Sequence, residues 1–151
     1  MAVEEKTCLF APGESCPHIG LLVLRVGIGS LFMAHGIIKF LGGVEFWENV
    51  GGAIGMFGIH FAPAFWGFMA AFAEAVGGLC LVLGLFVRPA AMLMAFTMIV
   101  AATTLVKGGG GFTVSSNPIH MIAVFVALIF SGSGRYGLGK CIGALKGKWY
   151  Q

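Results

Sequence analysis

The chain has 151 residues, of which 58% are hydrophobic and only 10% charged, and its mean hydropathy is +0.96. Soluble domains carry about a quarter charged residues, and a chain of about 150 residues buries only about 70% of its unfolded surface. The composition therefore argues against a soluble globular enzyme or a disordered tail and predicts a membrane protein in a lipid bilayer. The net charge of +3 is too small to indicate a nucleic-acid partner.

Four apolar runs predict membrane-spanning helices, each of which needs about 20 apolar residues. They cover residues 19–41, 64–86, 89–106 and 118–131. The last run is short, and its Asn117–Pro118 start is typical of a helix cap followed by proline at the first position. We expect this helix to thin the bilayer or to continue towards Tyr136. The predicted fold is an all-α, polytopic bundle of four transmembrane helices.

The segment between the first two spans, residues 42–63, is too short and too polar to cross the membrane and return. Its Phe46-Trp47-Glu48 sequence predicts a short interfacial helix with aromatic rings at headgroup depth.

Positive residues predict the orientation, because loops rich in Lys and Arg stay cytoplasmic. Arg88 joins the second and third spans, and four basic residues follow the fourth: Arg135, Lys140, Lys146 and Lys148. Both termini and the Arg88 turn are therefore expected in the cytoplasm. We divide the chain into an N-terminal tail (1–18), a four-helix membrane domain (19–136) and a basic C-terminal tail (137–151).

The four cysteines have no CxxC or zinc spacing, and no metal site is expected. Cys8, Cys16 and Cys141 would lie on the reducing side and Cys80 within the second span, so structural disulfides are not expected. A Cys8–Cys16 redox pair is the alternative.

Ionisable groups inside the spans are the candidate functional residues, because each costs about 2.5–3.5 kcal/mol on insertion scales. In the first span, Arg25, His35 and Lys39 fall within an arc of about 80°. Glu74 lies in the middle of the second span among small residues, and His120 lies near the start of the fourth. Counting depth along the helices predicts one polar cluster, with Lys39, His35 and His120 above Glu74 and Arg25 beneath it.

Structural explanations compete with a functional cluster. Lys39 could extend to the headgroups, and Glu74 with Arg25 could form a buried pair that only fixes helix register. His120 could cap the fourth helix or meet lipid headgroups, and Arg88 is typical of a topology and anchoring residue.

Three functional hypotheses fit the cluster. Arg25, Lys39 and His120 could hydrogen-bond a quinone, with Glu74 and His35 as the catalytic groups and Glu74 carrying the proton. Alternatively, His35 and His120 could be the axial ligands of a b-type haem, which we consider the weaker hypothesis because axial histidines are common. A proton- or ion-coupled path through Glu74 is the third.

The chain resembles the DoxX/DoxD family of small four-helix membrane proteins from Leu21 to Gly139. The first span carries Leu24-Arg25 and His35-Gly36-Ile37-Ile38-Lys39, and the second carries Glu74-Ala75-Val76-Gly77-Gly78. The exit turn reads Gly84-Leu85-Phe86-Val87-Arg88-Pro89-Ala90-Ala91, and the chain after the fourth span reads Gly132-Ser133-Gly134-Arg135-Tyr136-Gly137-Leu138-Gly139.

The resemblance implies redox work in the cytoplasmic (inner) membrane of a bacterium or archaeon. DoxD-like members are a subunit of thiosulfate:quinone oxidoreductase, and DoxX-like members are linked to thiol and oxidative-stress chemistry. By resemblance, the polar signature is Arg25, His35, Lys39, Glu74 and Arg88. We expect a quinone-linked subunit that works with partner subunits of a redox complex. The alternative is a non-catalytic scaffold or assembly subunit.

Overall fold

The structure is a computed structural model that describes residues 16–140. Within these residues it is helical, and four helices are long and apolar enough to cross a membrane. They are α1 (Cys16–Leu41), α3 (Pro63–Leu83), α4 (Val87–Lys107) and α5 (Gly111–Ser131). The predicted fold class is confirmed. Cys8 and Cys141, the Cys8–Cys16 alternative and most of both predicted tails lie outside the described residues.

Shorter helices join and follow the long ones. The helix α2 (Gly43–Gly51) and the 3-10 helix η1 (Gly52–Phe57) connect α1 to α3, and the 3-10 helix η2 (Leu138–Lys140) follows α5. The short helix predicted around Trp47 is therefore confirmed, and it is longer than the single turn that the aromatic residues indicated.

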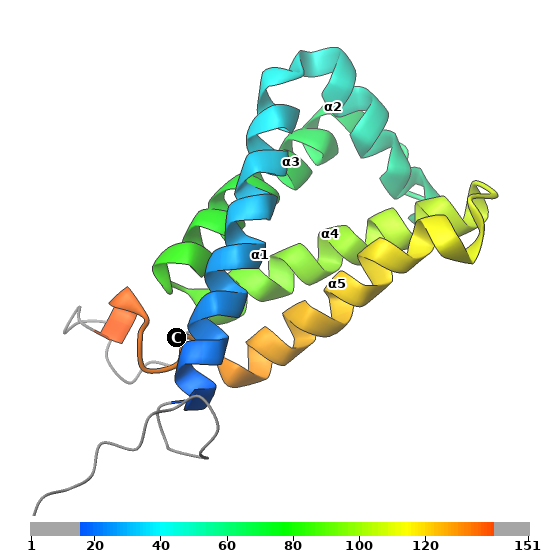
Figure 1. The fold of residues 1–151 in the computed structure, drawn as a ribbon. Coiled ribbons are helices and arrows are strands. Elements are labelled where there is room, and N and C mark those ends of the chain that lie inside the picture. Colours follow the sequence, from blue (N-terminus) through cyan, green and yellow to red (C-terminus); the bar gives the residue numbers. More distant parts are fainter. Residues whose placement is uncertain (1–15, 141–151) are drawn as a thin grey trace, which may run out of the picture.

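The long helices form two pairs, α1 with α3 and α4 with α5 (Figure 1). The pairs meet at the Arg88 end, which we define as residues 84–88 and 132–140. They diverge towards the opposite end, the Trp47 end, which comprises α2, η1 and residues 108–110. There η1 reaches across to α4, and Lys107 donates a hydrogen bond to the carbonyl of Met56 at 3.5 Å. The two ends of the bundle are thus packed differently.

Glycines bring α1 and α3 into close contact. A Cβ built on Gly36 would collide with the backbone of Ala75, and one built on Gly29 would lie 2.7 Å from the carbonyl oxygen of Gly78. Small residues permit such approach between membrane helices. Glu74, next to Ala75, is consequently held close to the backbone of α1.

The start of the fourth long helix differs from the prediction. Helix α5 begins at Gly111, and Pro118 lies inside it rather than at its first position. Proline at this position removes the backbone hydrogen bond to the carbonyl of Val114, a loss that membrane helices tolerate. Ser115 donates to the carbonyl of Gly111 and Ser116 to that of Thr113, each at 2.8 Å. The predicted cap at Asn117 is wrong, and α5 has 21 residues, so it spans without thinning the bilayer.

The main hydrophobic core lies where α3, α4 and α5 converge towards the Arg88 end. Its fully buried members are Leu81, Val87, Ala91, Met94, Phe125 and Leu128. Phe32 of α1 packs against Phe125 with ring centroids 5.1 Å apart, which ties α1 to this core. The tightest packing is therefore away from the Trp47 end.

Candidate functional site

An ion pair joins α1 and α3 in the half of the bundle nearer the Trp47 end. Lys39 Nζ donates to Glu74 Oε1 at 2.6 Å. The Glu74 side chain is 3% exposed and that of Lys39 is 25% exposed, so the pair is partly shielded from its surroundings. No other ion pair is present among the side chains that the structure describes, those of residues 17–139. Lys39 therefore does not simply extend away from the bundle, which was one of the alternatives.

Aromatic side chains fix the backbone on which Lys39 stands. Trp47 Nε1 of α2 donates to the carbonyl of Lys39 at 2.8 Å. The Trp47 ring packs against Phe68 of α3, and Phe40 packs against both, with centroids 5.3–6.5 Å apart and near-perpendicular planes. Such edge-to-face packing favours a defined geometry. The short helix α2 thus serves to position the ion pair.

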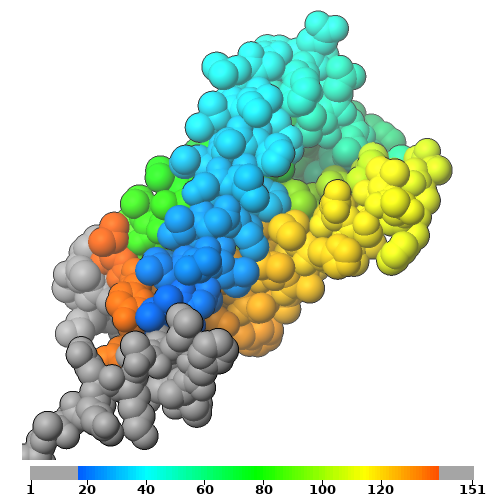
Figure 2. Space-filling model, viewed as in Figure 1, coloured from blue at the N-terminus to red at the C-terminus, as the bar shows by residue number. Residues whose placement is uncertain are grey.

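The ion pair lies in the wall of a cavity of about 410 Å³ between η1, α3 and α4. The space-filling view shows a hollow where the cyan end of α1 and the yellow-green part of α4 separate (Figure 2). Most lining residues are apolar, and they include Ile54, Phe65, Trp66, Met69, Ala70, Leu93, Phe96, Met98 and Val100. An apolar cavity with a few polar groups is typical of a small-molecule site, and this volume is within the usual range.

Exposed apolar side chains surround the opening of this cavity. Phe65, Leu93 and Phe96 line it and are 45–52% exposed. Leu93 and Phe96 lie near the middle of α4, which spans Val87–Lys107. In a bilayer these residues would meet lipid chains, so an apolar ligand would enter from the hydrocarbon region.

Trp66 is a site residue that the sequence analysis missed. It lines the cavity, and its Nε1 is buried without a hydrogen-bond partner among the described residues. Oε2 of Glu74 is likewise buried without a partner. Leaving such a group unpaired costs about 1–3 kcal/mol. Trp66, Ala70 and Glu74 follow the i, i+4, i+8 spacing of one helix face, which is the signal that could have revealed Trp66.

Arg25 is not part of this site, and the alternative of a buried Arg25–Glu74 pair is wrong. It is fully buried at the Arg88 end, where Nη1 donates to the carbonyl of Leu81 at 3.5 Å and Nη2 to that of Tyr136 at 3.4 Å. Leu81 belongs to the last turn of α3, where its carbonyl also accepts the backbone N–H of Gly84 at 3.2 Å. Arg25 therefore joins α1 to the end of α3 and to the segment after α5.

Glycine at position 84 is required for that arrangement. Gly84 ends α3 with φ +69°, and a side chain there would collide with Nη1 of Arg25. Its carbonyl accepts a hydrogen bond from the backbone N–H of Gly139 at 3.4 Å. The glycine-rich segment after α5 thus closes over the α3–α4 turn.

The two histidines of the predicted cluster do not join the ion pair. His35 is exposed on α1, where its ring makes an edge-to-face contact with Phe32 at 6.3 Å, and His120 is exposed on α5. Arg88 is half-buried at the start of α4, and its Nε has no partner among residues 16–140. Of the five residues predicted to cluster, the structure brings together Lys39 and Glu74.

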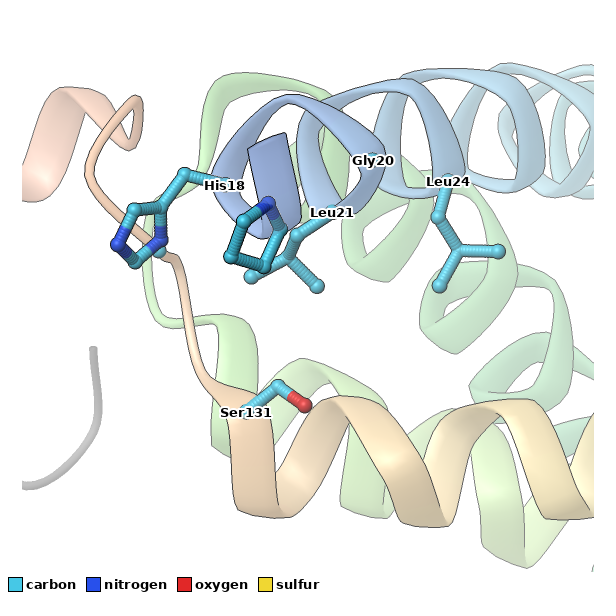
Figure 3. Close-up of a pocket in the computed structure, with 7 residues that line it drawn as sticks. His18, Gly20, Leu21, Leu24 and Ser131 are labelled. Atoms are coloured by element: carbon cyan, nitrogen blue, oxygen red, sulfur yellow. The ribbon is translucent and has the colours of Figure 1, made fainter. Parts of the chain in front are cut away.

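A second cavity of about 410 Å³ lies between the first turns of α1 and the end of α5. His18, Leu21 and Leu24 of α1 face it from one side and Ser131 from the other (Figure 3). It contains neither an ion pair nor a residue predicted to be functional. The part of the chain that the structure describes contains no group of three His, Cys, Asp or Glu side chains that could hold a metal ion. The cavity beside Lys39 and Glu74 is therefore the candidate site.

A bundle of four membrane-spanning helices with an ion pair beside an apolar cavity defines a polytopic membrane protein with a ligand-sized site. The DoxX family model matches residues 20–107, more than half of the chain, and the protein belongs to the DoxX family. The match contains α1 to α4, and with them Lys39, Trp66 and Glu74. It ends before α5, so the resemblance of the segment after α5 stays a prediction.

One similar protein is a Bacillus subtilis (strain 168) protein named "Putative oxidoreductase CatD". The two chains are 37% identical over 88 residues, which are 58% of this chain and 60% of that relative, less than two thirds of its length. No solved structure matches the chain. The comparisons therefore place the protein in a family with an oxidoreductase relative.

Proposed function

We propose that the protein is a quinone-binding membrane subunit of an oxidoreductase, and that the ring binds in the cavity beside Lys39 and Glu74. One observation carries the proposal: the wall of an apolar cavity contains an ion pair, and exposed Phe and Leu side chains line the same cavity. An isoprenoid quinone has the matching chemistry. Its apolar tail lies in the bilayer, and its ring oxygens form hydrogen bonds and take up or release protons. The family resemblance to a subunit of thiosulfate:quinone oxidoreductase supports the same substrate class.

The two charged residues have distinct roles in this proposal. The Lys39 ammonium donates a hydrogen bond and stabilises negative charge on a ring oxygen, while the Glu74 carboxylate accepts or returns the proton that accompanies electron transfer. Trp66 supplies a further donor. The side chains that line the cavity store no electrons, so the proposal includes a partner subunit that supplies or removes them.

The proposal also includes the orientation. The Arg88 end faces the cytoplasm of a bacterium or archaeon, because it carries Arg88 and Arg135. The Lys39–Glu74 pair, towards the opposite end, then exchanges protons with the outer side of the inner membrane.

Copurification tests this function. The full chain is purified in mild detergent from membranes that contain quinone, and the bound molecules are extracted and identified by mass spectrometry. We expect quinone to be retained by the native protein and largely lost from Ala70→Phe, which fills the cavity. Ala34→Phe is the matched control, because Ala34 is exposed on α1 and does not line the cavity.

Retention of phospholipid alone would contradict the proposal, and so would equal quinone content in the two variants. Normal quinone content in Ala70→Phe, with a melting temperature like that of the native chain, would place the quinone elsewhere.

A further inference from the structure

One of the two carboxylate oxygens of Glu74 has a hydrogen-bond partner and the other has none. Oε1 accepts the hydrogen bond from Lys39, whereas Oε2 is buried and has no partner within the described chain. An ionised carboxylate has acceptors only. A molecule that satisfies this oxygen must therefore bring a hydrogen-bond donor.

Two other polar side chains of the cavity, those of Trp66 and Lys39, have the opposite requirement. The indole N–H of Trp66 is a donor only, as is the ammonium of Lys39. A ring oxygen can accept from either of them, whether it is a carbonyl or a hydroxyl. Trp66 and Glu74 are eight residues apart, about 12 Å along α3, so two separate sides of a ligand meet these two demands. Of the two cavity side chains with a buried, unpartnered polar atom, Glu74 is the one that distinguishes a hydroxyl from a carbonyl.

We propose that the cavity binds the reduced, hydroxyl-bearing ring in preference to the oxidised quinone. This inference rests on the proposed function and adds which redox form the site recognises. One quinol hydroxyl donates to Oε2 of Glu74, and the oxygen on the other side of the ring still accepts from Trp66. A quinone carbonyl opposite Oε2 would place two acceptors against each other in a buried site, where unpaired polar groups are costly.

Equilibrium binding of matched ligands tests the preference. The probes are decylubiquinone, its quinol held reduced under argon, and the dimethyl ether of that quinol, each added to the full chain in lipid nanodiscs. We expect the quinol to bind about tenfold more tightly than the quinone, the ratio that one additional charge-assisted hydrogen bond gives. The dimethyl ether, which keeps the ring but has no donor, should bind no better than the quinone.

Variants assign the preference to one atom. Glu74→Gln replaces an acceptor with an amide that can donate to a carbonyl, so the ratio should fall to about one or invert. Trp66→Phe should weaken both redox forms equally and leave the ratio unchanged. Glu48→Gln, at an exposed carboxylate of α2 outside the cavity lining, should change neither affinity.

The outcomes separate this inference from the proposed function. Binding of quinone and quinol with equal affinity would overturn the inference and leave the proposed function intact. Binding of neither form would overturn both. A dimethyl ether that binds as tightly as the quinol would overturn the inference even if Glu74→Gln fails to fold, because that comparison uses only the native chain.

Discussion

Arg25 and Glu74 are both almost fully buried, at 0% and 2% exposed, but their surroundings differ. Arg25 donates to two backbone carbonyls at the Arg88 end and contacts the closed turn at Gly84, and its Nε is buried without a partner among the described residues and away from the lining of either cavity. Glu74 has one side-chain partner, one unpaired oxygen and a cavity beside it.

The difference shows that the free-energy cost of placing a charged residue in a membrane span does not by itself reveal whether that residue has a structural or a ligand-binding role. An ionisable residue within a membrane span is a functional candidate by default. Arg25 instead holds three parts of the chain together, since its donors complete the end of α3 and fix the segment after α5. Glu74 retains hydrogen-bonding capacity next to space for a ligand. We therefore expect Arg25 to contribute to stability and Glu74 to ligand binding.

Replacement of Arg25 should have the largest effect on stability. Arg25→Met preserves much of the buried volume but removes the donors to the carbonyls of Leu81 and Tyr136, of which Leu81 keeps only the backbone N–H of Gly84. We expect a loss of about 3 kcal/mol in the free energy of unfolding, or about 10 °C in melting temperature, measured by circular dichroism in detergent. Arg135→Met, at an exposed arginine of the same end, is the control and should melt like the native chain. Equal melting of both variants would show that Arg25 has no structural role.

The contact between α1 and α3 lies between these two charges, and Gly36 tests it. A methyl group at position 36 would collide with the backbone of Ala75, which must move away from α1. Overpacking of this kind costs about 1–3 kcal/mol, and the displacement should weaken the Lys39–Glu74 pair and quinone retention together. Gly27→Ala is the matched control, because a Cβ there meets nothing within 4 Å. A Gly36→Ala protein that retains both native stability and quinone would contradict this packing.

The sequence was sufficient to predict the number of long helices, because each apolar run has the length that a bilayer requires. It also predicted an inward face of α1 with Arg25, His35 and Lys39, of which Arg25 and Lys39 lie inward and His35 is exposed. It could not predict their partners. Counting residues along a helix gives the depth of a side chain in the membrane, but it does not give which neighbouring helix lies close to it at that depth. The alternative of a buried Arg25–Glu74 pair is therefore wrong: Arg25 donates to backbone carbonyls instead, and its Nε has no partner among the described residues.

Two further errors have local causes. Proline favours the first position of a helix, and Pro118 therefore predicts a helix start, whereas α5 begins at Gly111 and holds Pro118 in its interior. Trp66 was missed because an uncharged indole in a membrane span is common. Its importance depends on the cavity and on its unpaired N–H, and neither is visible in a sequence.

The smallest expected effect concerns the coupling between Lys39 and Glu74, and a double-mutant cycle measures it. Lys39→Met leaves a buried carboxylate without its partner, and Glu74→Gln removes that charge. Because Lys39 is a quarter exposed, we expect an interaction energy of only about 1 kcal/mol in thermal unfolding, with the double variant more stable than the sum of the single losses predicts. The pair Lys39→Met and Glu48→Gln should be additive, since Glu48 is exposed and makes no ion pair with Lys39. Additivity in both cycles would mean that Lys39 and Glu74 do not interact. Glu74 would then have no side-chain partner, and its described difference from Arg25 would be wrong.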